Sequence, residues 1–178
     1  MTTPLFGPVM QLGFVVPDLE AAARHWVSLG VGPFFLLEHI QFAEVRYQGR
    51  ETRFDMSVAV AQWGEVQVEL IHQHDAAPSI YTDFAGAKPG GLQHLGVMTD
   101  SVSTHLERLA PYGVTPVQVG ATGNGIRFAY VNTDRLPGGT PGGMIELIEH
   151  GPAIDGFFHI VKKASLGWDG RDPLRRLG

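Results

Sequence analysis

The sequence predicts an α+β fold made of two tandem β-α-β-β-β modules, and two observations predict it. A strand, a capping residue and an amphipathic helix follow one another near the start of the chain and again from Gly91. The triplet Glu-Leu-Ile also recurs late in each half, at Glu69 and at Glu146. A repeat of this length with the same order of elements indicates duplication of one supersecondary unit. We expect a first module at residues 1–71, a linker at 72–90, a second module at 91–150 and a helical tail at 151–178.

The first module begins with a strand at residues 9–16 that is rich in branched side chains. Asp18 follows it and is suited to cap a helix, whose apolar residues recur at helical spacing until Gly30 ends it. Strands are then expected at residues 34–43, 53–61 and 65–71, with a tight turn at 62–64 between the last two.

The linker is rich in His, Asp, Ala, Pro and Gly, and one helical turn is expected within it at residues 78–84. The second module repeats the pattern, with a strand at 91–100 and with Asp100 as the expected cap of a helix that ends before Gly113. Further strands are expected at 114–119, 126–132 and 144–148.

Two segments lie outside these regular elements. Residues 136–143 are so rich in Gly and Pro that they predict a turn or a mobile flap able to gate a pocket. In the tail, Phe157, Phe158, Ile160 and Val161 predict a short amphipathic helix that covers either the pocket mouth or a dimer partner.

Composition narrows the class of partner. The 178 residues are 44% hydrophobic and 17% charged, with a net charge of −5 and a pI near 5.9. Such a chain carries no electrostatic footprint for nucleic acid or an anionic membrane, so a small-molecule partner is expected. No apolar stretch is long enough to span a bilayer and the start of the chain lacks a signal-peptide pattern, so we expect a cytoplasmic protein. With no cysteine, any metal must be held by nitrogen and oxygen atoms.

Superposing the halves aligns the candidate functional residues. Leu12-Gly13 lies on Leu95-Gly96, so Gln11 aligns with His94, and the shared Glu-Leu-Ile aligns Glu69 with Glu146. A lone histidine in an apolar strand is often satisfied by a backbone carbonyl, which is one interpretation of His94. The other is a divalent-metal site, because packing the halves about a pseudo-twofold axis would bring all four side chains to one point.

The aligned segments, together with APSIYTDF before GGLQHLGV, resemble the vicinal oxygen chelate superfamily, in its glyoxalase I and methylmalonyl-CoA epimerase branch. The resemblance covers about residues 9–150. It implies a curled, open-barrel sheet around a central metal pocket, the glyoxalase/bleomycin resistance/dioxygenase fold. It also implies that Gln11, Glu69, His94 and Glu146 bind a divalent ion, Zn, Ni, Co or Mn in preference to Fe. Glutamine at position 11 matches some glyoxalase I enzymes and departs from the usual epimerase pattern.

The resemblance implies a metal-dependent lyase or isomerase that transfers a proton next to a carbonyl group through a metal-stabilised enediolate or enolate. Glu146 is the expected main base and Glu69 its partner on the opposite face, and the alternative is that both are plain ligands. The substrate is then a small carbonyl compound, including thiol or coenzyme A conjugates, and homodimers are common in the superfamily.

Two other functions remain on the same scaffold. A drug-sequestering protein would bind its ligand without turnover and need no metal. An extradiol-type dioxygenase is disfavoured, because such enzymes bind iron with two histidines and one carboxylate, whereas these positions offer one histidine.

Several other polar residues have ordinary interpretations. Arg46, Arg50 and Arg53 predict a solvated strand edge, although they could also meet a substrate carboxylate or phosphate. His72 and His74 follow Glu69 and are expected to be solvated or packing residues, and His39 is expected at a strand end.

Overall fold

The computed structural model describes residues 4–87, 90–134, 136 and 143–177. Its strands and helices follow the chain in this order: β1 (Val9–Val15), α1 (Leu19–Ser28), β2 (Phe34–Leu37), β3 (Phe42–Tyr47), β4 (Arg50–Glu51), β5 (Met56–Trp63), β6 (Val66–Gln73), α2 (Ile80–Ala87), β7 (Gly91–Thr99), α3 (Val102–Leu109) with a 3-10 turn at Ala110–Tyr112, β8 (Pro116–Thr122), β9 (Arg127–Asn132), β10 (Met144–Glu149), α4 (Pro152–Ser165) and β11 (Leu174–Arg176).

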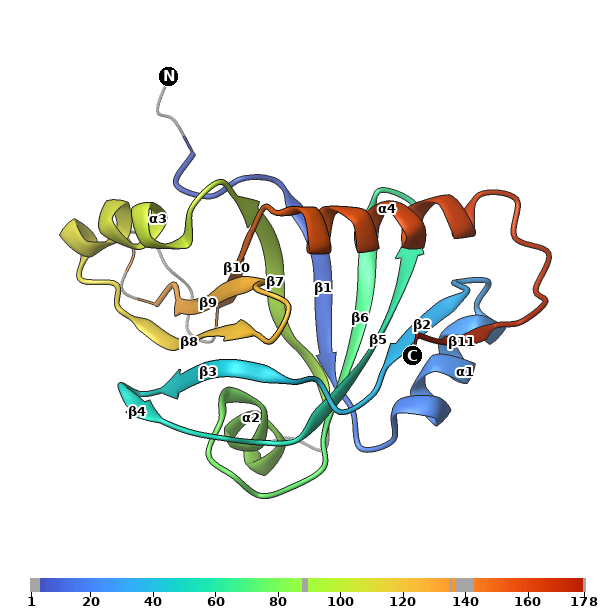
Figure 1. The fold of residues 1–178 in the computed structure, drawn as a ribbon, viewed down its shortest axis with the longest axis horizontal. Helices are drawn as coiled ribbons and strands as arrows, with labels where there is room; N and C mark the ends of the chain where they lie inside the picture. Colours follow the sequence, from blue (N-terminus) through green and yellow to red (C-terminus); the bar gives the residue numbers. More distant parts are fainter. Residues whose placement is uncertain (1–3, 88–89, 135, 137–142, 178) are drawn as a thin grey trace.

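All the described strands form one strongly curled sheet with the order β11-β2-β5-β6-β1-β7-β10-β9-β8-β3-β4 (Figure 1). Within it, β1-β6-β5-β2 of the first half and β7-β10-β9-β8 of the second half have the same arrangement. The first strand of each half pairs in parallel with the last strand of that half, and β1 pairs antiparallel with β7. The predicted α+β fold with a curled, open sheet is therefore confirmed.

The two halves meet at a local pseudo-twofold axis. Leu12 of β1 lies opposite Leu95 of β7, and on either side of this pair Gln11 faces Gly96 and Gly13 faces His94. Gln11 is equivalent to His94 and Gly13 to Gly96, so the same pair of positions meets on either side of the axis, as expected for a duplicated unit.

The strand expected at residues 34–43 is instead two strands, β2 and β3. His39 between them has a backbone φ of +51°, which is incompatible with an extended strand and turns the chain away from the first half. As a result β3 pairs with β8 of the second half, and β4 pairs with β3 at the sheet edge. Sequence alternation alone carries no signal for such a change of partner.

Helices α1 and α3 cover the outer face of the two halves, while α4 runs along the open end of the sheet above β1, β6 and β5 (Figure 1). The Asp18 side chain caps α1 by accepting a hydrogen bond from the Ala21 N–H at 2.9 Å. The cap expected at Asp100 is wrong, because α3 begins one residue later and Ser101 accepts the Thr104 N–H instead.

Three apolar clusters hold the layers together. One fills the inside of the curl and includes Phe54, Tyr81 and Phe128, and the other two lie under α1 and α3 respectively. Side chains from the two halves meet in the first cluster, so the concave face is the shared core of both halves.

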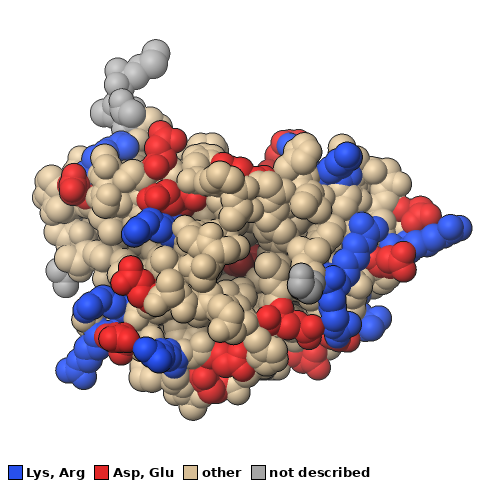
Figure 2. Space-filling model, in the orientation of Figure 1, with Lys and Arg blue, Asp and Glu red and all other residues tan. Residues whose placement is uncertain are grey.

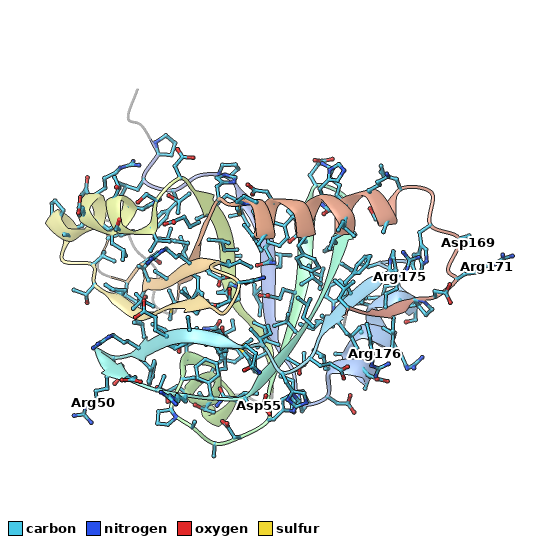
Figure 3. The ribbon with its side chains drawn as sticks, viewed as in Figure 1. Arg50, Asp55, Asp169, Arg171, Arg175 and Arg176 are labelled. Carbon is cyan, nitrogen blue, oxygen red and sulfur yellow. The ribbon has the colours of Figure 1, made fainter. Side chains whose placement is uncertain are left out.

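The tail is held against the first half. Trp168 covers Gly32 so closely that a β-carbon there would lie 2.7 Å from the indole ring, and β11 adds to β2 in parallel. Arg176 pairs with Glu20 and Glu38, and Arg175 lies over the Phe35 ring (Figure 3). The sequence predicts the helix but gives no sign of β11.

Smaller differences from the predicted elements concern turns. The turn between β5 and β6 is Gly64-Glu65, with Gly64 at φ +60°, so that Trp63 still pairs with Val66. The expected helical turn at 78–84 is the helix α2. Most of the expected flap, residues 137–142, lies outside the described residues. No described helix has the length and hydropathy needed to span a bilayer.

Candidate metal and proton-transfer site

The four residues aligned by the internal repeat project from neighbouring strands onto the concave face of the sheet. Across the sheet, Glu69 of β6, Gly13 of β1 and His94 of β7 form one row, and Gln11 of β1, Gly96 of β7 and Glu146 of β10 form the next. Residues directly opposite one another across paired strands point to the same face. The strand order therefore collects one amide, one imidazole and two carboxylates.

Two glycines make this convergence possible. A β-carbon on Gly13 would lie 1.9 Å from Cε1 of His94, and one on Gly96 would lie 2.9 Å from Cβ of Gln11. The side chain from each half therefore occupies the space above the glycine of the other half. The pair Leu-Gly after Gln11 and after His94 was visible in the repeat, but its role is evident only from the register between β1 and β7.

His94 lies at the centre of the cluster. Its Nε2 atom is 3.2 Å from Oε2 of Glu146 and 3.5 Å from Oε2 of Glu69, and its Nδ1 atom is 2.8 Å from the Gln93 side-chain oxygen. Because an amide oxygen only accepts, Nδ1 carries a hydrogen and Nε2 is the atom directed at the carboxylates. In the metal-free protein Nε2 also carries a proton, and its loss on metal binding would leave the Nδ1–H tautomer that a metal-binding imidazole requires.

Gln11 is oriented in a similar way. Its Nε2 atom donates to the Gln67 side-chain oxygen at 3.1 Å, and Gln67 is itself buried. That bond directs the Gln11 amide oxygen away from Gln67. Oε1 of Gln11 is buried and has no hydrogen-bond partner among the described residues.

Burial and charge both shift the titration of the cluster. Burial raises the pKa of Glu69, the His94 side chain opposes this effect, and the Glu146 charge adds to it. Burial alone would lower the pKa of His94, but the carboxylates of Glu146 and Glu69 outweigh it and raise the pKa to about 9. A carboxyl group with a raised pKa beside a second carboxylate is the arrangement expected of a group that takes up and returns protons.

Two buried tyrosines add to the polar part of the site, and no sequence pattern singled them out. Their hydroxyl oxygens, on Tyr81 of α2 and Tyr130 of β9, are 2.9 Å apart, and the Tyr130 ring packs edge-on against His94 at 5.2 Å. Burial and the charge of Glu146 raise the pKa of both phenols well above the usual value. They therefore stay protonated and can donate hydrogen bonds.

The site opens into a cavity of about 680 Å³, including its mouth. Gln11, Glu69, Glu146, Tyr81 and Tyr130 supply its polar part. The remaining described lining is apolar apart from Thr122. Helix α4 contributes Ile154, Phe157 and Phe158. The other apolar lining residues are Leu37, Ile40, Phe42, Met56, Val58, Val60, Ile126, Phe128 and Ile148. Among the described residues no lysine or arginine lines it, and His94 is fully buried against the lining residues Glu69, Glu146 and Tyr130. Arg46, Arg50 and Arg53 are exposed elsewhere, so the substrate contact considered for them is not supported.

The donor set fits a divalent cation. Ligand atoms of Glu69, His94 and Glu146 all lie within 4.8 Å of one another, and Gln11, whose amide oxygen has no hydrogen-bond partner among the described residues, lines the same cavity. A neutral imidazole, an amide oxygen and two carboxylates suit Zn²⁺, Ni²⁺, Co²⁺ or Mn²⁺, and an incomplete shell would leave positions for water or substrate. Figure 2 shows the molecule hollowed near the middle of this view, with acidic atoms visible in the hollow and the charged side chains mainly around it.

The fold and the sequence together place the chain in a family. Residues 10–130 match the model of the Glyoxalase/Bleomycin resistance protein/Dioxygenase superfamily, and the chain belongs to this superfamily. No curated protein matches the sequence at a significant level.

Several solved structures share the fold. The chain is similar to methylmalonyl-CoA epimerase from Mycobacterium tuberculosis, with 19% identity, a TM-score of 0.59 and coverage of 88% of this chain and 96% of that one. A hypothetical protein from Bacillus halodurans has 18% identity and a TM-score of 0.57, with 81% and 94% covered. A variant of Streptomyces coelicolor methylmalonyl-CoA epimerase, in complex with 2-nitronate-propionyl-CoA, has 14% identity and a TM-score of 0.53, with 83% and 96% covered. At these identities the likeness concerns the fold.

Proposed function

We propose that this protein is a metal-dependent lyase or isomerase of the glyoxalase or epimerase type, which moves a proton on a carbon next to a carbonyl group. The observation that carries the proposal is the convergence of two carboxylates, one imidazole and one unpaired amide oxygen at the base of an apolar cavity. Gln11, Glu69, His94 and Glu146 would hold the ion. When bound, a divalent ion supplies the positive charge that stabilises an enolate or enediolate oxygen.

The chain's own groups account for the proton movement. A Glu146 oxygen accepts the proton from the α-carbon, and the bonding electron pair moves toward the carbonyl oxygen. Return of that proton by Glu146 to the neighbouring carbon gives isomerisation, whereas delivery of a proton by Glu69 to the opposite face gives epimerisation. The second route needs Glu69 to carry a proton when the substrate binds.

The cavity wall supports a class of substrate. The described lining carries no lysine or arginine, so the ion would bind any negatively charged group on the reacting part of the substrate. The remainder of the substrate inside the cavity would be apolar, like the lining. Because one of the Tyr81 and Tyr130 hydroxyls donates to the other, the pair has one remaining O–H, which would donate to a substrate oxygen. Methylmalonyl-CoA epimerase structures in complex with methylmalonyl-CoA and with 2-nitronate-propionyl-CoA share the fold, so such thioesters and thiol hemithioacetals are the first compounds to test.

The direct test is proton exchange with solvent. Metal-reconstituted protein would be incubated in D₂O with methylmalonyl-CoA and with the glutathione hemithioacetal of methylglyoxal, and deuterium at the α-carbon followed by NMR. We expect Glu146→Gln to slow exchange or turnover by at least about a hundredfold, the usual contribution of a general base. Glu65→Gln is the matched control, because Glu65 precedes the same strand as Glu69 but its side chain is 89% exposed.

The outcomes separate the candidate functions. Exchange that depends on the ion and on Glu146 supports the enzyme, whereas equal exchange by Glu146→Gln and Glu65→Gln would reject the role of Glu146. Ligand binding with no exchange in any sample would favour a sequestering protein.

A further inference from the structure

A second group of metal-binding side chains lies away from the central cavity. His39 is in the loop between β2 and β3, Asp55 directly precedes β5, and His74 directly follows β6. One ligand atom from each of the three lies within 4.8 Å of the other two. Figure 3 shows Asp55 at the end of the strands opposite α4. No role in the proposed proton transfer accounts for this group.

Hydrogen bonds fix the three side chains relative to one another. Nδ1 of His39 lies 2.8 and 2.9 Å from the two carboxylate oxygens of Asp55. The His39 backbone N–H donates to the Ser57 hydroxyl at 3.0 Å, and that hydroxyl lies 2.8 Å from Nε2 of His74. The imidazole rings of His39 and His74 are 4.9 Å apart. Pre-arranged ligands of this kind reduce the ordering cost of binding an ion.

Two neighbours reinforce the group. The His72 ring packs edge-on against His74 at 4.8 Å, and its Nδ1 atom is 3.1 Å from the Val16 carbonyl oxygen. Because a carbonyl only accepts, His72 carries a hydrogen on Nδ1. Asp75 accepts the Asp55 backbone N–H at 2.9 Å and adds a second carboxylate.

The backbone at His39 indicates that the position is specified. Its φ of +51° is in the left-handed region, which costs a residue with a β-carbon about 1 kcal/mol or more. The side chain is nevertheless 63% exposed, so burial of apolar surface does not explain the residue. Strained residues that remain on a surface are found preferentially at binding sites.

We propose that His39, Asp55 and His74 form a second cation site, for a late first-row divalent ion such as Zn²⁺. Two imidazoles and one carboxylate are the nitrogen and oxygen ligands that these ions prefer, and the exposed position leaves room for water in the remaining coordination positions. The site is independent of the proposed activity and uses none of the central residues.

Binding there would have a structural consequence. The three ligands come from three chain segments, so an ion would join the loop after β2 to the ends of β5 and β6. Ile40 and Phe42 follow His39 directly and line the central cavity. An ion at this site would therefore restrict one wall of that cavity.

Zinc stoichiometry tests the proposal. Metal-free full-length protein would be dialysed against buffered Zn²⁺ at pH 7.5, and bound zinc measured by elemental analysis. We expect His39→Ala/His74→Ala to bind one ion per chain fewer than the parent, and Asp55→Asn to weaken the same site by at least about tenfold. His25→Ala/His159→Ala is the control, since it removes two histidines that are also exposed and should retain the parent stoichiometry.

Thermal unfolding without metal would verify that each variant is folded, which is expected because the altered side chains are largely exposed. Equal zinc binding by His39→Ala/His74→Ala and by the control would overturn the site and leave a hydrogen-bonded cluster. A parallel His94→Gln sample separates the two proposals, because it loses the central ion alone. If His94→Gln changes nothing while His39→Ala/His74→Ala loses an ion, the second site stands and the central one fails.

Discussion

At the residue scale, the candidate site depends as much on two missing side chains as on the four polar ones. Gly13 and Gly96 occupy the positions across which His94 and Gln11 lie, and any β-carbon there would enter the space of the ring or the amide. Close approach of a neighbouring group is one of the few reasons for glycine inside a strand. Glycine at these two positions is therefore a requirement of the site.

Gly13→Ala tests this requirement. We expect it to displace the His94 ring, to abolish zinc binding at the central site and to destabilise the fold by about 1–3 kcal/mol, the usual cost of overpacking. Gly156→Ala in α4 is the control: a β-carbon there has open space, so stability should be unchanged or higher by about 0.5–1 kcal/mol. Urea unfolding and zinc content measure both. Normal zinc binding by Gly13→Ala would contradict the assigned geometry.

The pKa of His94 leads to a prediction about proton release when the metal binds. In the metal-free protein the pKa is raised to about 9, so at pH 7 the imidazole is protonated, with Glu69, Glu146 and the Tyr130 ring facing it. A metal ligand must be neutral, so binding at pH 7 should release about one proton, and affinity should rise with pH until about 9. Calorimetry in two buffers of different ionisation enthalpy measures the release. The experiment would use the His39→Ala/His74→Ala variant, so that only binding of the central ion is observed. A binding enthalpy that does not depend on the buffer would contradict the assignment of His94 as a ligand.

At the scale of elements, α4 converts an open sheet into a cavity. The helix lies outside the internal repeat, yet Ile154, Phe157 and Phe158 line the central cavity, and Phe157 packs edge-on against Phe35 of β2. Trp168 and β11 then tie the tail to the first half. The segment after the duplicated modules thus supplies one wall of the cavity, and under the proposed function this wall would contact the apolar part of the substrate.

Phe157→Ala should therefore affect substrate binding more than chemistry. Loss of the ring removes apolar contact from the cavity wall, so we expect KM for the substrate found by deuterium exchange to rise about tenfold with little change in kcat. Ile160→Ala is the matched control, because Ile160 is on the same helix but half exposed and outside the cavity lining. A fall in kcat with unchanged KM would contradict the role of α4 as a binding wall.

At the scale of the whole molecule, duplication explains what the sequence could predict. The repeat of Leu-Gly and of Glu-Leu-Ile was sufficient to predict the paired modules, and the structure brings the four aligned residues to one point on the sheet. The repeat contains no information on features that break it. The turn at His39, the strands β3 and β11, and the helix α2 that carries Tyr81 have no equivalent in the other half. The pairing of β3 with β8 and the contact of Tyr81 with Tyr130 also join residues distant in sequence.

The histidines at the end of β6 illustrate the same difficulty. His72 and His74 were expected to be solvated or packing residues, and His39 was expected simply at a strand end. Only folding brings His39 and Asp55 next to His74, because each belongs to a different strand end. Clusters of this kind become visible when the sheet order is known.

The central claim is that one divalent ion is held jointly by the two halves, and anomalous diffraction tests it most directly. Crystals of the protein reconstituted with Zn²⁺ or Co²⁺ would be measured on either side of the metal absorption edge. We predict an anomalous peak within bonding distance, about 2.0–2.2 Å, of Nε2 of His94 and of oxygen atoms of Glu69, Glu146 and Gln11. A map with no peak among these four side chains, in crystals where the metal is present at saturating concentration, would contradict the account.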